Sequence, residues 1–63
     1  MILKGKVSSL EINGARVTFQ DRENIVSSAL QVASDVGTLK VGENVAAVFF
    51  SDNMNDGLII ARW

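Results

Sequence analysis

The sequence predicts a small all-β barrel, and three observations support this fold class. Apolar runs of strand length are separated by turn residues, most clearly at Asn13-Gly14 and between Asp52 and Gly57. The last two runs, residues 45–50 and 58–61, are apolar at every position, so both of their faces need cover. A chain of 63 residues forms one domain, residues 1–63, and a closed barrel removes sheet edges that so short a chain can hardly protect.

The composition excludes several classes of function. The chain has no Cys and no His, which rules out disulfides and removes the usual ligands of zinc and haem. A net charge of −1 provides no general attraction to nucleic acid or to anionic lipid. No apolar run approaches the roughly 20 residues that a membrane helix needs. The apolar run at the N-terminus is also too short for a signal peptide. We therefore expect a cytoplasmic protein with no membrane partner.

The first predicted strand covers residues 2–12 and changes parity along its length. Leu3 and Val7 share one parity, whereas Leu10 and Ile12 share the other. Such a change needs an extra residue, so we predict a β-bulge at residues 8–9. Gly5, inside the same strand, indicates a sharp bend or a close backbone approach.

Asn13-Gly14 follows at once and is the strongest short-range hairpin signal in the chain. We predict a type I′ turn with positive φ at both residues. The next strand, residues 15–20, alternates regularly between apolar and polar side chains. Its predicted inward residues are Ala15, Val17 and Phe19.

Residues 25–33 fit two patterns. At helical spacing, Ile25, Val26, Ala29, Leu30 and Ala33 form one apolar stripe, which periodicity alone slightly favours. At a period of two, the same segment alternates as a strand, with residues 26, 28, 30 and 32 on one face. Both alternatives stay open on periodicity.

The final hairpin begins after a predicted turn at Lys40-Val41-Gly42. A barrel holds one row of side chains per strand inside, so only one row of each apolar strand fits the core. In one register Val45, Ala47 and Phe49 point inward with Leu58 and Ile60; in the other register the opposite rows do. The first register leaves an interface outside that consists of Val48, Phe50, Ile59 and Trp63.

These elements add up to a five-stranded barrel that is OB-like or SH3-like. An apolar patch of several hundred Å² is rarely left bare on a soluble monomer. We therefore expect a homo-oligomer, with a trimer or a two-fold dimer as the alternatives.

The chain resembles the OB-fold domain of phage baseplate and tail-spike assembly proteins and of contractile secretion spike proteins. The residues that carry the resemblance span nearly the whole chain and are Gly5-x-Val7, Asn13-Gly14-x-Arg16-Val17-x-Phe19-x-Asp21, Ser28-x-Leu30-x-Val32, Val41-Gly42-Glu43-x-Val45-x-x-x-Phe49 and Asp56-Gly57-x-Ile59-Ile60-x-Arg62.

The resemblance implies that residues 28–32 form a strand, which changes our expectation for the ambiguous segment from helix to strand. It also implies a structural role in a tail or baseplate, with other phage tail proteins as partners. The chain departs from the family in having Thr38-Leu39-Lys40 where Pro and an aromatic are common, and Ala61 where Gly is usual. The family's spikes continue into a long trimeric β-helix, whereas this sequence stops at Trp63. We therefore expect a stand-alone adaptor rather than a needle.

Catalytic and metal sites find little support in the sequence. Residues 52–57 resemble a cation loop, but an EF-hand spacing would put Met54 at the third position and Trp63 where the bidentate Glu belongs. The carboxylates lie in turns or at strand ends, and no His or Cys could activate a serine. We predict that the chain is not an enzyme and has no cofactor or metal.

A single-stranded nucleic-acid-binding OB-like module is the alternative function. Such a module needs stacking aromatics on a basic face. Lys4, Lys6 and Arg16 could form a small basic patch, but the aromatics lie among aliphatic residues in the sequence. We therefore expect nucleic acid not to be the partner.

Overall fold

A computed structural model describes residues 1–52 and 56–63 of the chain. The strands of this part are β1 (Ile2–Glu11), β2 (Gly14–Phe19), β3 (Ile25–Val26), β4 (Gln31–Val32), β5 (Asn44–Phe49) and β6 (Gly57–Arg62), and the 3₁₀ turn η1 (Gln20–Arg22) follows β2. These described residues contain no α-helix. The predicted all-β class is confirmed.

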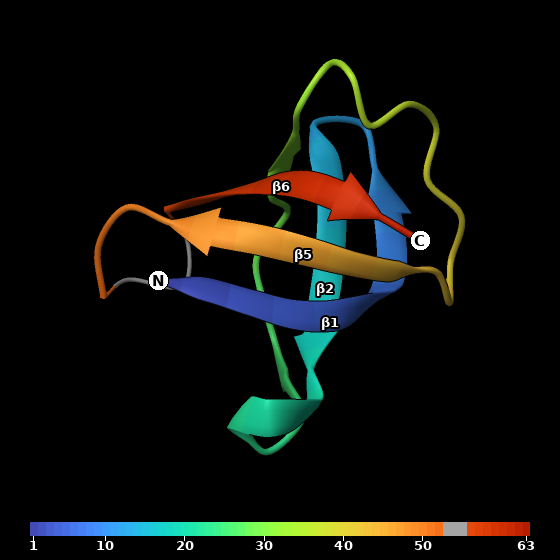
Figure 1. The fold of residues 1–63 in the computed structure, drawn as a ribbon. Coiled ribbons are helices and arrows are strands. Elements are labelled where there is room, and N and C mark those ends of the chain that lie inside the picture. The colour runs from blue at the N-terminus through green and yellow to red at the C-terminus, as the bar shows by residue number, and fades with distance from the viewer. Residues whose placement is uncertain (53–55) are drawn as a thin grey trace.

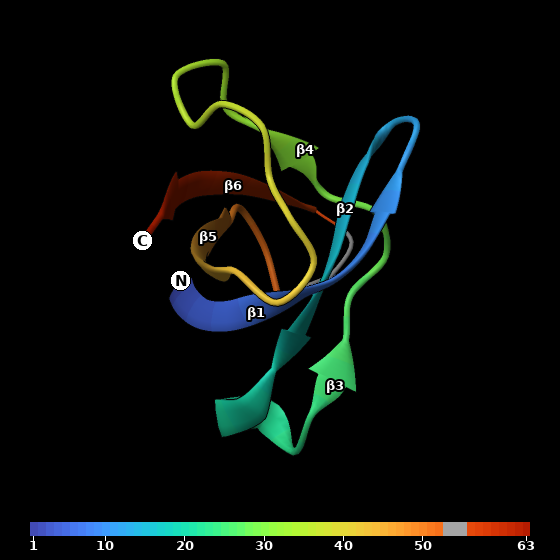
Figure 2. The same ribbon diagram turned by 90° about the vertical axis from the view of Figure 1, so that its right-hand side faces the viewer.

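The strands form one curled sheet in the order β3-β2-β1-β5-β6-β4. β1, β5 and β6 lie side by side in Figure 1 with β2 behind them, and Figure 2 shows how the sheet curls around the core. Its ends meet, because Ala15 in β2 and Leu30, just before β4, exchange backbone hydrogen bonds of 3.0 and 2.9 Å. β4 pairs in parallel with β6. The six strands thus form a small barrel-like sheet.

The predicted β-bulge in β1 is confirmed. The pairing of β1 with β2 slips by one residue between Val7 and Ser9, so Ser8 is the extra residue. The bend lets β1 pair with β5 through residues 2–6 and with β2 through residues 6–11. At Gly5 a Cβ atom would lie 2.5 Å from the carbonyl oxygen of Thr18, which confirms the predicted close approach.

The first hairpin lies where it was predicted, but the predicted turn was wrong. Glu11 pairs with Gly14, so Ile12 and Asn13 form the two-residue turn, and the φ angle of Asn13 is not positive. Gly14 instead begins β2 with a φ of 152°. A Cβ atom there would collide with the carbonyl group of Leu30. The glycine is required where the two ends of the sheet meet.

Residues 25–33 contain two short strands rather than a helix, so the strand interpretation is confirmed in part. Between β3 and β4 the chain is irregular, and Ser27 is buried there. The N–H of Val17 donates to the Ser27 hydroxyl at 3.1 Å, and the Ser27 N–H donates to the Val17 carbonyl at 2.9 Å. A side-chain oxygen thus replaces a backbone carbonyl, and the predicted third strand exists as two pieces.

The long connection from β4 to β5 covers one end of the barrel and buries Val36 and Leu39. Its predicted turn is confirmed: the N–H of Glu43 donates to the Lys40 carbonyl at 3.1 Å. Arg62 in β6 anchors the connection, because its Nε atom donates to the Val36 carbonyl at 2.7 Å.

The final hairpin confirms the first of the two predicted registers for β5 only. Val45, Ala47 and Phe49 are buried. The predicted turn at residues 52–57 lies partly outside the described residues, and on its near side the N–H of Phe50 donates to the Asp56 carbonyl at 3.0 Å.

For β6 the inward row is that of the other register, a choice that the sequence left open. Ile59, expected outside, is fully buried, whereas Leu58, expected inside, lies on the outer side opposite Val48. The β5–β6 pairing also slips next to Ala47, where Ile60 is the extra residue and is 38% exposed. Neither the pairing register nor this bulge could be derived from apolar residues alone, because both rows of β6 are apolar.

The core fills the space that the curled sheet encloses. Phe19 and Phe49 meet edge to face at its centre, with ring centroids 5.5 Å apart. The buried apolar residues are Val7, Ala15, Val17, Phe19, Leu30, Val36, Leu39, Val45, Ala47, Phe49 and Ile59.

Candidate protein-interaction surfaces

The first candidate surface is the outer face of the layer β1–β5–β6, the side turned toward the viewer in Figure 1. Pairing places side chains from the three strands in rows across this face. One row is entirely apolar and consists of Ile2, Val48 and Leu58; the next consists of Lys4, Ala46 and Ala61. We call these two rows, together with Phe50 and Trp63, the outer face.

The structure places three of the four predicted interface residues on this outer face. Val48 is half-buried, Phe50 is 67% exposed and Trp63 is 61% exposed. Ile59 belongs to the core and drops out of the prediction.

Two outer-face residues were missed by the sequence analysis. Ile2, 64% exposed, pairs directly with Val48, and Leu58 does so from the other side. The parity of Ile2, opposite to that of Leu3 and Val7, was the available signal.

A basic corner borders this face near the C-terminus. The backbone N–H of Trp63 donates to the Asn44 carbonyl at 3.1 Å, and Asn44 pairs with Lys6. Lys4, Lys6 and Trp63 line one hollow of about 270 Å³. The expectation that the aromatics lie apart from the basic residues was therefore wrong for Trp63.

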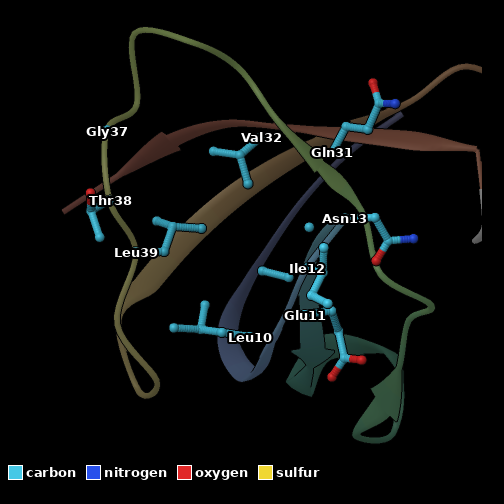
Figure 3. A pocket seen from close by; sticks show the side chains of 11 residues that line it. Leu10, Glu11, Ile12, Asn13, Gln31, Val32, Gly37, Thr38 and Leu39 are labelled. Atoms are coloured by element: carbon cyan, nitrogen blue, oxygen red, sulfur yellow. The ribbon is translucent and has the colours of Figure 1, made fainter.

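The second candidate surface is a hollow of about 510 Å³ between the first hairpin, β4 and the connection near Leu39. We call it the hairpin groove. Its apolar lining comes from three separate segments, with Leu10 and Ile12 on the hairpin, Val32 on β4 and Leu39 on the connection (Figure 3). Leu10 is 50% exposed, and Ile12 at the tip of the hairpin is fully exposed.

Polar side chains mark the opposite end of the hairpin groove. Asn13 and Gln31 also line a neighbouring hollow of about 570 Å³, which reaches Phe50 and Asp56. The two hollows therefore adjoin at Asn13 and Gln31, and we call the pair the furrow. Among the described residues that line them, Glu11 and Asp56 carry the charges, and both are acidic.

Glu43 and Arg62 form an ion pair near the C-terminal end of the chain. Glu43 Oε2 lies 3.1 Å from Nη1 of Arg62. The backbone N–H of Lys40 donates to the other carboxylate oxygen at 2.6 Å. The Lys40 N–H, and after it Arg62, lower the pKa of Glu43 below its ordinary value of 4.5. This carboxylate fastens the turn before β5 to β6.

Residues 1–52 and 56–63 contain no cluster of three or more His, Cys, Asp or Glu side chains able to hold a metal ion. In the same ranges no helix has the length and apolarity to cross a membrane. Residues 52–57, for which the sequence analysis rejected a cation loop, lie partly outside the described residues.

Comparisons of the chain with protein-family models, with curated proteins and with solved structures found no match. The function must therefore be argued from the two surfaces.

Proposed function

We propose that this chain is a non-enzymatic structural or assembly module that works through protein–protein association. The resemblance of its turn and strand motifs supports a place in the tail or baseplate of a phage or prophage, with other tail proteins as partners. Such a module acts in the cytoplasm during assembly and in the particle afterwards. It needs no cofactor.

One observation carries this proposal: an entirely apolar row crosses all three strands of the outer face. Ile2, Val48 and Leu58 lie directly opposite one another, and their neighbours Ala46 and Ala61 add small side chains that let a partner approach closely. A face of this kind offers on the order of 500 Å² of apolar surface, which monomers rarely leave exposed.

The first partner to consider is a second copy of the chain. At about 25 cal/mol per Å², burying such a face would stabilise a complex by on the order of 10 kcal/mol before the costs of association. A 63-residue fold has a small core, so this contribution is large relative to its own stability. A dimer or a trimer would cover the outer face.

Sedimentation velocity at micromolar concentration tests the proposal. We expect a species of two or three chains for the wild type, and a monomer of 6.8 kDa for Val48→Lys. The matched control is Val26→Lys, because Val26 is 48% exposed on β3 outside this face. A folded wild-type monomer at all concentrations would contradict self-association and leave a different protein as the occupant of the face.

The basic corner gives single-stranded nucleic acid as a second candidate partner. Lys4 and Lys6 can contact phosphates while Trp63 stacks on a base, a combination found in single-strand-binding modules. Trp63 is the only Trp, so an oligonucleotide that stacks on it would quench the intrinsic fluorescence. Quenching that weakens with added salt and is lost in Lys4→Ala would favour this candidate; unchanged fluorescence would remove it.

A further inference from the structure

The hairpin groove combines an apolar hollow with an unpaired strand edge. β5 pairs with β1 only through residues 2–6, and beyond the contacts of Val7 with residues 42 and 43 no described strand occupies that side of β1. Residues 8–11 therefore have a free edge, and Leu10 and Glu11 of this stretch line the groove. An exposed strand edge is a template for an added strand.

The backbone of Leu10 points to this free edge. Ala15, which lies opposite Leu10, directs its N–H and carbonyl groups away from β1, because it bonds to Leu30. In an antiparallel pair, two opposed residues either exchange both bonds or both face away from each other. The N–H and carbonyl groups of Leu10 thus face away from β2, toward the groove.

The side chains around this edge can hold alternate residues of an added strand. Leu10, Val32 and Leu39 surround the hollow, whose volume of about 510 Å³ accommodates a few aliphatic side chains. Leu10 itself is half exposed to solvent. An extended segment bound at the edge would place every second side chain against these residues.

The acidic residues that line the two hollows favour a basic peptide segment. Glu11 at the hairpin and Asp56 at the far hollow are its charged described residues, and no described cation lines either hollow. Acidic peptides and nucleic acids would meet like charge, whereas Lys or Arg side chains would meet a carboxylate. Asn13 and Gln31 add donors and acceptors for a backbone or a basic side chain.

We propose that the hairpin groove binds an extended peptide segment of a partner protein, paired with β1 at Leu10. The segment carries aliphatic residues at alternate positions and at least one Lys or Arg between them. This site is separate from self-association through the outer face, so either proposal can fail without the other.

The test is a titration of the ¹⁵N-labelled protein with the capped peptide Val-Lys-Val-Lys-Val, followed by amide chemical shifts. We expect saturable shifts at Leu10, Gln31 and Thr38. The Glu analogue, Val-Glu-Val-Glu-Val, should bind at least about tenfold more weakly because of its charge. Val-Lys-Pro-Lys-Val should also bind at least about tenfold more weakly, because proline has no N–H to donate to the strand edge.

Variants of the protein provide the second arm. Leu10→Lys should weaken binding of Val-Lys-Val-Lys-Val about tenfold, and Glu11→Gln about threefold, whereas Val41→Lys should leave it unchanged. Val41 is the matched control because it is 62% exposed and does not line the groove. Amide spectra establish that each variant is folded.

Four results would overturn the proposal. They are the absence of saturable shifts up to about 2 mM peptide, shifts centred on the outer face, equal affinity for the Glu analogue, or an oligothymidylate that binds this groove more tightly than the peptide.

Discussion

The two faces of the layer β1–β5–β6 have similar chemistry and opposite surroundings. Inside, Val45, Ala47 and Ile59 are fully buried against the rest of the barrel. Outside, Ala46, Val48 and Leu58 have only partial cover from their own chain. The barrel itself therefore covers only one of the two apolar sides of these strands, and we propose that a partner covers the other.

The largest contrast between the faces should come from two neighbouring residues of β6. Ile59→Ala removes a fully buried side chain and should lower the free energy of unfolding by about 4 kcal/mol. Leu58→Ala, on the outer side, should cost the dilute monomer below about 1 kcal/mol. Urea unfolding at low protein concentration measures both. Equal losses in the free energy of unfolding of the two variants would contradict the assignment of Ile59 to the inner face and Leu58 to the outer face.

The inner face exists because the ends of the sheet meet at Ala15 and Leu30, and Gly14 permits that approach. Gly14→Val would push a β-branched side chain against the Leu30 carbonyl and would hold an unfavourable positive φ. We expect a loss of about 3 kcal/mol in the free energy of unfolding. An unchanged melting temperature would show that the barrel is not closed at this position.

Ser27 lies in the same region, where the segment before β4 bonds to β2. Ser27→Ala leaves the buried N–H of Val17 without the hydroxyl that accepts its hydrogen bond. A loss of about 2 kcal/mol is expected, because a buried donor is left unsatisfied. Ser28→Ala is the control and should change stability by less than about 0.5 kcal/mol. Thermal unfolding of both variants compares them, and similar melting temperatures would refute the role of the Ser27 hydroxyl.

The smallest expected effect concerns Glu43, which is half-buried beside Arg62. Its pKa is lowered in the folded chain, so its ionised form stabilises the fold above the ordinary value of 4.5, and that contribution is lost as the pH falls through the lowered pKa. The difference in melting temperature between wild type and Glu43→Gln should therefore shrink on acidification below 4.5. Added salt should also reduce it. A difference that is constant from pH 7 to pH 3 would contradict this role.

Local sequence signals predicted the parts of the fold that depend on one or two residues. The slip at Ser8 followed from the parity of the apolar residues in β1, and the close backbone approach at Gly5 followed from the absence of a side chain. Alternation gave the buried row of β2 correctly, ending at Phe19. In each case a single strand carries the necessary information.

Features that depend on contacts between distant segments were not predictable in the same way. Gly14 was assigned to a turn, although Leu30, which requires the glycine, lies far away in the sequence. Ile59 was placed outside because both rows of β6 are apolar and only the pairing with β5 separates them. The hairpin groove could not be predicted from the sequence, because Leu10 and Leu39 are brought to the same hollow only by the curvature of the sheet.

If the outer face, and not another surface, is covered by association, Trp63 reports on it directly. Trp63 is the only Trp in the chain, lies on that face and is 61% exposed. Its emission maximum and its acrylamide quenching should be measured from nanomolar to high micromolar protein, in parallel with sedimentation. We expect the emission maximum to shift to shorter wavelength and the acrylamide quenching to decrease. Both changes should have the same midpoint in protein concentration as the rise in mass. Emission that stays solvent-exposed while the mass doubles or triples would contradict it.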